Sequence, residues 1–244
     1  LADAVPFVHG EFATNLSLNG SNIDGSGIGI CVIDTGVNED HTGISDSIVE
    51  EYCYCSSDGG CCPNGKTEDS SAEDDNGHGT AVIGTITSQD SEQRGIAAGA
   101  DIVAIKAFNS DGTGTTSDVL SGITKCLEKA EEHNIKVFSF SFGGSSYSAA
   151  CDTDPLAAVV NDLQELGFFV AAASGNNGES DKMTTPACGS NVTSVGAVYD
   201  NSSASADTVA SFSNANSLLD VLAPGVDICT TAIPGSGHPW WCWW

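Results

Sequence analysis

Six short apolar runs without polar alternation constrain the fold more than any other feature of this chain. They cover residues 28–33, 102–108, 135–142, 168–173, 192–198 and 218–223. A strand with one solvated face alternates apolar and polar residues, whereas a parallel strand covered on both faces is apolar throughout. The runs therefore predict the buried strands of a parallel sheet.

Helical patterns lie between several of these runs. One helix is predicted over residues 117–130 from its apolar stripe, and a shorter one over residues 79–87. A third has Asp154 as its N-cap, Pro155 in its first turn and Gly167 at its end. Strands that alternate with helices predict an α/β fold: a doubly wound, mainly parallel sheet with helices on both faces.

Three polar motifs fit the rule that this fold binds ligands at the carboxyl ends of strands: two follow predicted strands, and the one with a histidine starts the predicted helix over residues 79–87, so that its ring can project toward the sheet edge. They are Val-Ile-Asp-Thr-Gly at residues 32–36, Asn-Gly-His-Gly-Thr at residues 76–80, and Ser-Gly-Asn-Asn-Gly at residues 174–178. Imidazole titrates near neutrality, and a carboxylate behind it can fix its tautomer. Asp34 and His78 are therefore the predicted acid–base pair. Asp-Thr-Gly also occurs in aspartic proteases and in ordinary turns, but a second copy is missing here.

These motifs, in this order, resemble the subtilase (peptidase S8) family of serine endopeptidases. The resemblance runs from about residue 25 to 235 and includes Leu-Ala-Pro-Gly at residues 222–225. It implies a subtilisin-like fold, and it implies that Asp34 and His78 belong to an Asp-His-Ser triad. It also implies that Asn176 donates to the oxyanion. The implied substrates are polypeptides, bound by Ser141, Phe142, Gly143, Ser174 and Gly175.

The family's nucleophile motif, Gly-Thr-Ser, does not occur in the chain. The resemblance places that serine roughly 20 residues after the Pro-Gly pair, at or just beyond residue 244. The C-terminal part of the fold is therefore expected to be missing, and the chain is expected to be inactive as written. The alternative is a catalytically dead subtilase-fold domain that binds peptides or a partner protein.

The chain end departs from the family pattern. All four tryptophans lie within the last five residues. This composition indicates a changed reading frame or a mis-assembled sequence or, alternatively, an aromatic anchor on a pseudoenzyme. The expected organisation is an N-terminal extension over residues 1–24 that packs on the domain, a catalytic domain over residues 25–237, and an anomalous tail over residues 238–244.

Ten cysteines indicate an oxidising compartment and a secreted or extracellular protein. Cys53, Cys55, Cys61 and Cys62 lie in one loop and predict two local disulfides of open connectivity, because their spacing does not fit a zinc site. Cys31 is expected to be a small buried hydrophobe. The family resemblance implies a bridge between Cys151 and Cys188.

The charge is strongly negative, with 33 acidic residues, 7 basic residues and a formal net charge of −26. Such a field disfavours nucleic acid and anionic membrane surfaces as partners and suits concentrated salt, although a mildly acidic secreted enzyme also fits. A run of 18 apolar residues is missing, so a membrane span is not predicted. A signal peptide is not seen in these residues, either because it was removed or because it was never included.

The sequence assigns no metal ion with a catalytic role. The acidic stretch at residues 68–75 is expected to be a solvated loop, although calcium could bind there as a structural ion. No catalytic metal is assigned, because a His-x-x-x-His or similar ligand pair is missing. A metal-dependent hydrolase using His78 is therefore a weak alternative. We expect a monomer that acts on polypeptides.

Overall fold

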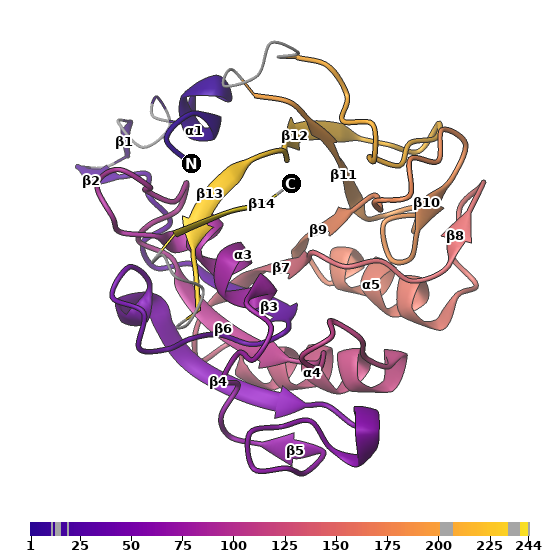
Figure 1. Ribbon diagram of the computed structural model, residues 1–244, viewed down its shortest axis with the longest axis horizontal. Coiled ribbons are helices and arrows are strands. Elements are labelled where there is room, and N and C mark those ends of the chain that lie inside the picture. The colour runs from indigo at the N-terminus through magenta and orange to yellow at the C-terminus, as the bar shows by residue number, and fades with distance from the viewer. Residues whose placement is uncertain (11, 13–15, 19, 201–206, 234–239, 244) are drawn as a thin grey trace. The chain divides into compact units, whose positions relative to one another are not determined.

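The chain forms two compact units, each built on parallel strands. The first unit contains Leu1–Ile135 and Cys229–Cys242, and the second contains Lys136–Ile228 and Trp243–Trp244. The structure, a computed structural model, describes residues 1–10, 12, 16–18, 20–200, 207–233 and 240–243 (Figure 1).

The first unit has the strand order β3-β6-β4-β5. These strands are β3 (Gly29–Asp34), β6 (Asp101–Lys106), β4 (Ile48–Tyr54) and β5 (Glu68–Asp69). β3 and β4 both run parallel to β6, and β5 runs antiparallel to β4. All six residues of β3 are buried, as its unbroken apolar run predicts. In the β3–β6 register, Asp34 lies opposite Lys106 at the carboxyl end.

Two helices cover opposite faces of this sheet (Figure 1). Cys31 of β3 is bonded to Cys126 of α4 (Thr116–Lys129), whereas Asp34 of β3 contacts His78 of α3 (His78–Thr87). Successive side chains of a strand point to opposite faces, so residues three apart lie on different faces. α4 and α3 therefore form the two outer layers around β3, which confirms the α/β class.

The expectation that Cys31 is a free buried thiol is wrong. Its sulfur is bonded to that of Cys126, across 95 residues of sequence, and both side chains are fully buried. The apolar neighbours of Cys31 correctly indicate burial. The partner lies on a helix that folding brings against the strand, so local sequence could not identify it.

The second unit has the order β7-β9-β11-β12, with all pairs parallel. Its strands are β7 (Ile135–Phe140), β9 (Phe169–Ala173), β11 (Thr193–Val198) and β12 (Val221–Pro224). α5 (Pro155–Glu165) packs on β9. As predicted, Asp154 caps α5 by accepting from the amides of Leu156 and Ala157 at 3.0 and 3.4 Å. Gly167 follows the helix with φ +93°.

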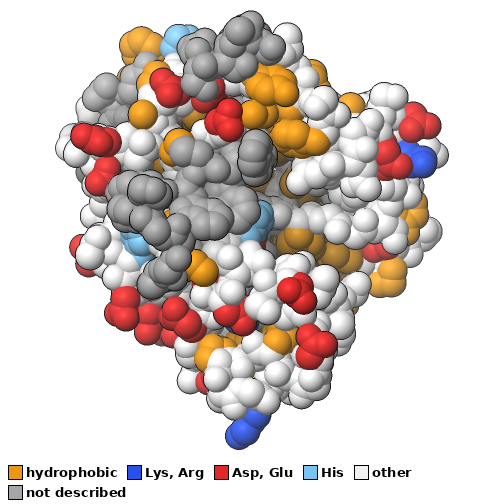
Figure 2. Space-filling model, viewed as in Figure 1, with side chains coloured by type: hydrophobic (Ala, Val, Ile, Leu, Met, Phe, Trp, Pro, Cys, Tyr) orange, Lys and Arg blue, Asp and Glu red, His pale blue; other side chains and the backbone are white. Residues whose placement is uncertain are grey.

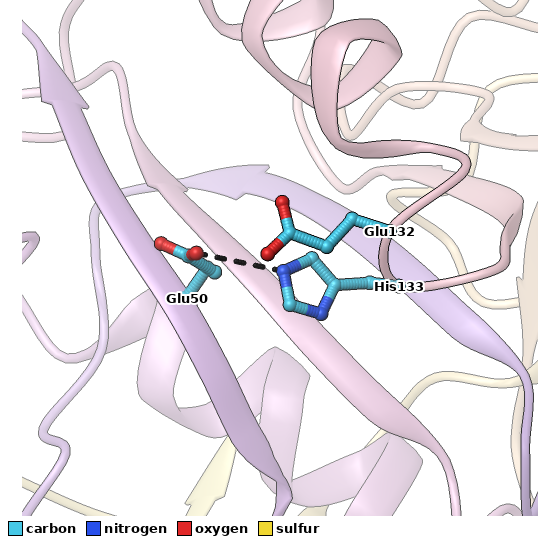
Figure 3. A group of neighbouring side chains, drawn as sticks. All are labelled: Glu50, Glu132 and His133. Atoms are coloured by element: carbon cyan, nitrogen blue, oxygen red, sulfur yellow. Dashed lines mark ion pairs between the residues drawn. The ribbon is translucent and has the colours of Figure 1, made fainter.

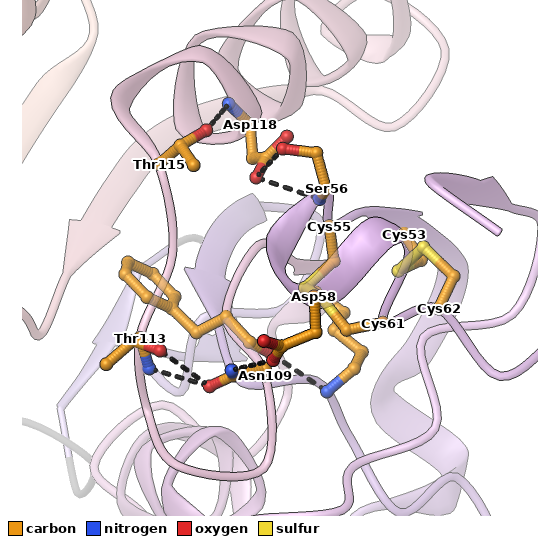
Figure 4. Close-up of a disulfide and its surroundings, with 12 residues drawn as sticks. Cys53, Cys55, Ser56, Asp58, Cys61, Cys62, Asn109, Thr113, Thr115 and Asp118 are labelled. Carbon is orange, nitrogen blue, oxygen red and sulfur yellow. Dashed lines mark hydrogen bonds between the residues drawn. A yellow bond between two sulfur atoms is a disulfide. The ribbon is translucent and has the colours of Figure 1, made fainter. Parts of the chain in front are cut away.

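The predicted disulfides are confirmed. Cys151 is bonded to Cys188, which joins the segment before α5 to the segment after β10. The four-cysteine loop forms two nested bridges, with Cys53 bonded to Cys62 and Cys55 to Cys61 (Figure 4).

The remaining described elements are short. In the first unit they are α1 (Ala4–Phe7), β1 (Ser17–Leu18), β2 (Ser21–Asn22), the 3-10 helices Ser45–Ser47 and Ser57–Gly59, β13 (Ile228–Thr231) and β14 (Trp240–Trp243). In the second unit, β8 (Ser146–Tyr147) pairs with β10 (Met183–Thr184). Most of the expected tail at residues 238–244 pairs through its backbone as β14, and residues 238, 239 and 244 lie outside the described part of the chain. None of the described helices is long and apolar enough to cross a membrane.

Candidate active site

The first unit brings two of the predicted site residues into contact. Asp34 is the last residue of β3 and is 2% exposed, and His78 is the first residue of α3. His78 Nδ1 lies 2.7 Å from Asp34 Oδ1, although 44 residues separate them in sequence. The carboxylate therefore holds the Nδ1 side of the imidazole, as in an acid–base pair.

The electrostatics of the pair favour a basic imidazole. The charge of Asp34 raises the pKa of His78 above its ordinary value of 6.5, burial opposes this rise, and the hydrogen bond to Asp34 and the charge of Asp74 add to it. Asp34 Oδ1 also accepts from the Thr35 amide at 2.7 Å. The other oxygen, Oδ2, is buried and has no hydrogen-bond partner among the described residues.

Asp74 lies behind this pair and makes five hydrogen bonds. Its Oδ1 accepts from Thr35 Oγ1 and from the amides of Asn76 and Gly77 at 2.9–3.0 Å. Its Oδ2 accepts from the Thr80 amide at 3.0 Å and from Thr80 Oγ1 at 2.6 Å. Asp74 is 5% exposed, so the expectation of a solvated loop is wrong at this residue. Sequence analysis did not single out Asp74, because it lies in a run of acidic residues. Its position four residues before His78 was the signal that could have identified it.

Lys106 is a second residue that sequence reasoning missed. It ends β6 opposite Asp34 and is 1% exposed. Its Nζ donates to the carbonyl oxygens of Thr35 and Phe108 at 2.8 and 2.9 Å, and to Asp75 Oδ1 at 2.6 Å. A lone lysine within the apolar run at residues 102–108 was the signal for it. Lys106 thus fixes the turn that follows Asp34.

The disulfide loop reaches the same region through Asn109 (Figure 4). Asn109 Nδ2 donates to Asp58 Oδ2 at 3.0 Å, while its Oδ1 accepts from Thr113 and from the Asp111 amide. The turn at residues 109–113 in turn accepts a hydrogen bond from Asn76 Nδ2, through the Ser110 carbonyl, at 2.9 Å. The two nested bridges therefore support a turn that contacts the histidine motif.

The second unit has a cavity of about 340 Å³, lined by the carboxyl-terminal halves of β7, β9, β11 and β12. It brings together four of the predicted residues: Ser141, Ser174, Gly175 and Asn176. Phe142 and Gly143 are not among the residues that line it. The Phe142 ring packs edge-on against Phe140, with centroids 5.7 Å apart.

Asn214 holds the loop that carries Asn176. Its Oδ1 accepts from the amides of Asn177 and Glu179 at 2.9 and 3.0 Å. Its backbone amide donates to the Gly175 carbonyl at 2.9 Å. Asn214 is fully buried, so the backbone on both sides of Asn176 is anchored to a fixed group.

One group of three metal-ligand side chains lies close together in the described part of the chain: Glu50, Glu132 and His133 (Figure 3). His133 Nε2 lies 3.5 Å from Glu50 Oε1. The ammonium of Lys129 lies 2.9 Å from a carboxylate oxygen of Glu50 and of Glu132. Calcium requires six to eight oxygen ligands. A nitrogen ligand and a resident ammonium do not fit calcium, and the group is an ion-pair cluster.

The surface carries the charge imbalance of the sequence. Figure 2 shows acidic side chains in several clusters on the viewed face, with Lys and Arg side chains only at its edges. This pattern agrees with the formal net charge of −26.

Comparisons with known proteins narrow the α/β class to a family. The sequence pattern of the subtilase family matches residues 25–239. The chain is 33% identical over 235 residues to serine protease AprX of Bacillus subtilis strain 168, covering 89% of this chain and 50% of that protein. It is 37% identical over 204 residues to the subtilase-type proteinase psp3 of Schizosaccharomyces pombe strain 972, covering 82% and 40%. The chain therefore belongs to the subtilase family.

A solved structure supports the same assignment. The crystal structure of a cold adapted subtilisin-like serine proteinase superposes with a TM-score of 0.64 at 29% identity, covering 89% of this chain and 71% of that one. The fold is thus subtilisin-like. The chain spans half or less of the length of the two relatives named above.

Proposed function

We propose that the chain carries the acid and base of a serine endopeptidase that uses an Asp-His-Ser mechanism. The observation that carries the proposal is the 2.7 Å contact between His78 Nδ1 and Asp34 Oδ1. In this role His78 takes the proton of a serine hydroxyl through Nε2 and returns it to the leaving amine. Buried Asp34 orients the imidazole and stabilises the imidazolium.

We assign Asn176 as the oxyanion donor of the same reaction. A side-chain amide aimed at the developing oxyanion contributes about 3–4 kcal/mol of transition-state stabilisation. Support comes from the position of Asn176 on the cavity wall and from the buried anchor Asn214 beside it. Ser141, Phe142, Gly143, Ser174 and Gly175 are the proposed contacts of an extended polypeptide substrate.

The 244 residues contain no Gly-Thr-Ser sequence. We therefore propose that they do not hydrolyse peptides by themselves, because the motif that carries the nucleophile is missing from them. Loss of a triad member leaves only roughly 10³–10⁴-fold acceleration over water. We further propose residues 1–24 as an extension, residues 25–237 as the catalytic domain and residues 238–244 as a tail outside it. Disulfides support secretion, and the negative charge argues against nucleic acid or membrane partners.

A matched pair of proteins tests the mechanism. One is the 244-residue chain, and the other carries a family-like segment with Gly-Thr-Ser in place of the residues after Ser236. Only the second should hydrolyse an unfolded protein and react with a serine-directed phosphonylating reagent. Its Gly-Thr-Ala version and its His78→Ala version are the controls. Hydrolysis and labelling by the unaltered chain would show that another serine is the nucleophile.

A second candidate function is peptide binding without hydrolysis. The chain has a formed cavity but no nucleophile motif, and this combination is the observation that favours it. Titration of the 244-residue chain with unfolded polypeptide, with Ser141→Trp as the blocked control, measures this activity. Saturable binding that Ser141→Trp abolishes supports the binding role.

A further inference from the structure

The five hydrogen bonds of Asp74 connect the two motifs that supply Asp34 and His78. One donor, Thr35, follows Asp34 directly. The other donors, Asn76, Gly77 and Thr80, lie on both sides of His78.

Thr35 links the same two segments a second time. Its Oγ1 accepts from the Gly79 amide at 2.8 Å and donates to Asp74 Oδ1 at 2.9 Å. Thr80 Oγ1, which donates to Asp74, also accepts from the Asn38 amide at 2.9 Å. We call Asp74, Thr35 and Thr80 the Asp74 clamp. All three side chains are at most 5% exposed, so water does not replace these contacts.

The clamp fixes the backbone immediately before and after His78. Gly77 precedes the histidine with φ +104°, a left-handed conformation that glycine adopts without steric cost, and its amide donates to Asp74. The Asp34–His78 contact depends on the direction of this backbone, because hydrogen bonds weaken steeply with distance and angle. We propose that Asp74 is a positioning residue that, with Thr35, aligns the His78 imidazole on Asp34. The inference rests on the proposed catalytic role of that pair.

The ionised form of Asp74 is the one that the clamp requires. Burial raises the pKa of this carboxyl, but hydrogen bonds from Thr80, Gly77 and Asn76 outweigh burial and hold the pKa below 3.8. A carboxylate offers acceptors on both oxygens, whereas an asparagine amide presents donors on one side. Asp74→Asn must therefore lose the contacts of one oxygen, either those to Thr80 or those to Thr35, Asn76 and Gly77.

The test is the titration of His78 in the 244-residue chain by NMR, which needs no nucleophile. The His78 signal is assigned by its disappearance in His78→Gln. Among the described residues, the charges of Asp34 and Asp74 act on this imidazole. Thr35→Val removes the clamp hydroxyl without changing any charge, and Thr35→Ser keeps it. Glu73→Gln removes the neighbouring charge in sequence and is the control for Asp74→Asn.

We expect Thr35→Val and Asp74→Asn to move the His78 midpoint to lower pH and to weaken its Nδ1–H resonance. Thr35→Ser and Glu73→Gln should leave both unchanged. Thermal melting shows which variants fold. If Asp74→Asn does not fold, the Thr35→Val variant alone tests the positioning role. An unchanged midpoint in a folded Thr35→Val protein refutes the positioning role. Asp34→Asn separates the two proposals: if it too leaves the midpoint unchanged, the catalytic pair is wrong as well.

Discussion

Removing the Cys31–Cys126 disulfide by the double substitution Cys31→Ala and Cys126→Ala should lower the free energy of unfolding sharply. The bridge closes a loop of 95 residues between β3 and α4. In the chain-entropy model, a loop of this length restricts the unfolded state by about 4.7 kcal/mol. Both sulfurs are fully buried, so lost packing adds to the cost.

The matched control is Cys55→Ala with Cys61→Ala, which makes the same chemical change in a loop of 6 residues. The same model gives about 2 kcal/mol for this bridge. The buried pair should therefore cost at least about 2.5 kcal/mol more than the control.

Urea denaturation without reductant, followed by far-ultraviolet circular dichroism, measures both losses. Non-reducing peptide mapping of the unaltered chain verifies the pairings. Equal losses for the two double variants would refute the loop-length argument, and a free Cys31 thiol in the map would refute the bridge itself.

Four further predictions concern charge and capping. Burial and the nearby charges of Glu39 and Glu73 raise the pKa of the Glu51 carboxyl from 4.5 to about 7. The ionised carboxylate therefore lowers the free energy of unfolding; this loss begins as pH rises above 4.5 and is complete above pH 7. Chemical denaturation should show that Glu51→Gln raises the free energy of unfolding by about 1–2 kcal/mol at pH 8, a value discounted for partial exposure, and by almost nothing at pH 4. A similar rise at pH 4 would contradict this explanation. Lys106→Met should cost about 3 kcal/mol in denaturation, because two buried carbonyls lose their donor; a neutral change refutes it. Asp154→Ala should cost about 1 kcal/mol through loss of the helix cap, measured by melting against Asp162→Ala inside the helix. With a net charge of −26, melting temperature should rise as salt shortens the screening length from about 30 Å at 0.01 M to 3 Å at 1 M, and a flat curve would count against net repulsion.

Much of the fold could be predicted because its signals are local. The strands β3, β6, β7, β9 and β11 lie within or next to the predicted apolar runs. β12 overlaps the last run, and Asp154 caps α5 as expected. The strand β4 was missed, because Glu50 and Glu51 interrupt its apolar pattern and most of its side chains are only partly buried.

The sequence by itself determined which segments form buried strands and helices, and it determined Asp34 and His78 as a pair, because periodicity and motif residues are properties of neighbours along the chain. Only the tertiary structure decided that Cys31 pairs with Cys126, that Asp74 is buried rather than solvated, and that Lys106 supports the turn after Asp34. Burial and hydrogen-bond partners depend on which distant segments pack together. A carboxylate or an ammonium has the same local sequence whether it faces water or buried hydrogen-bond partners.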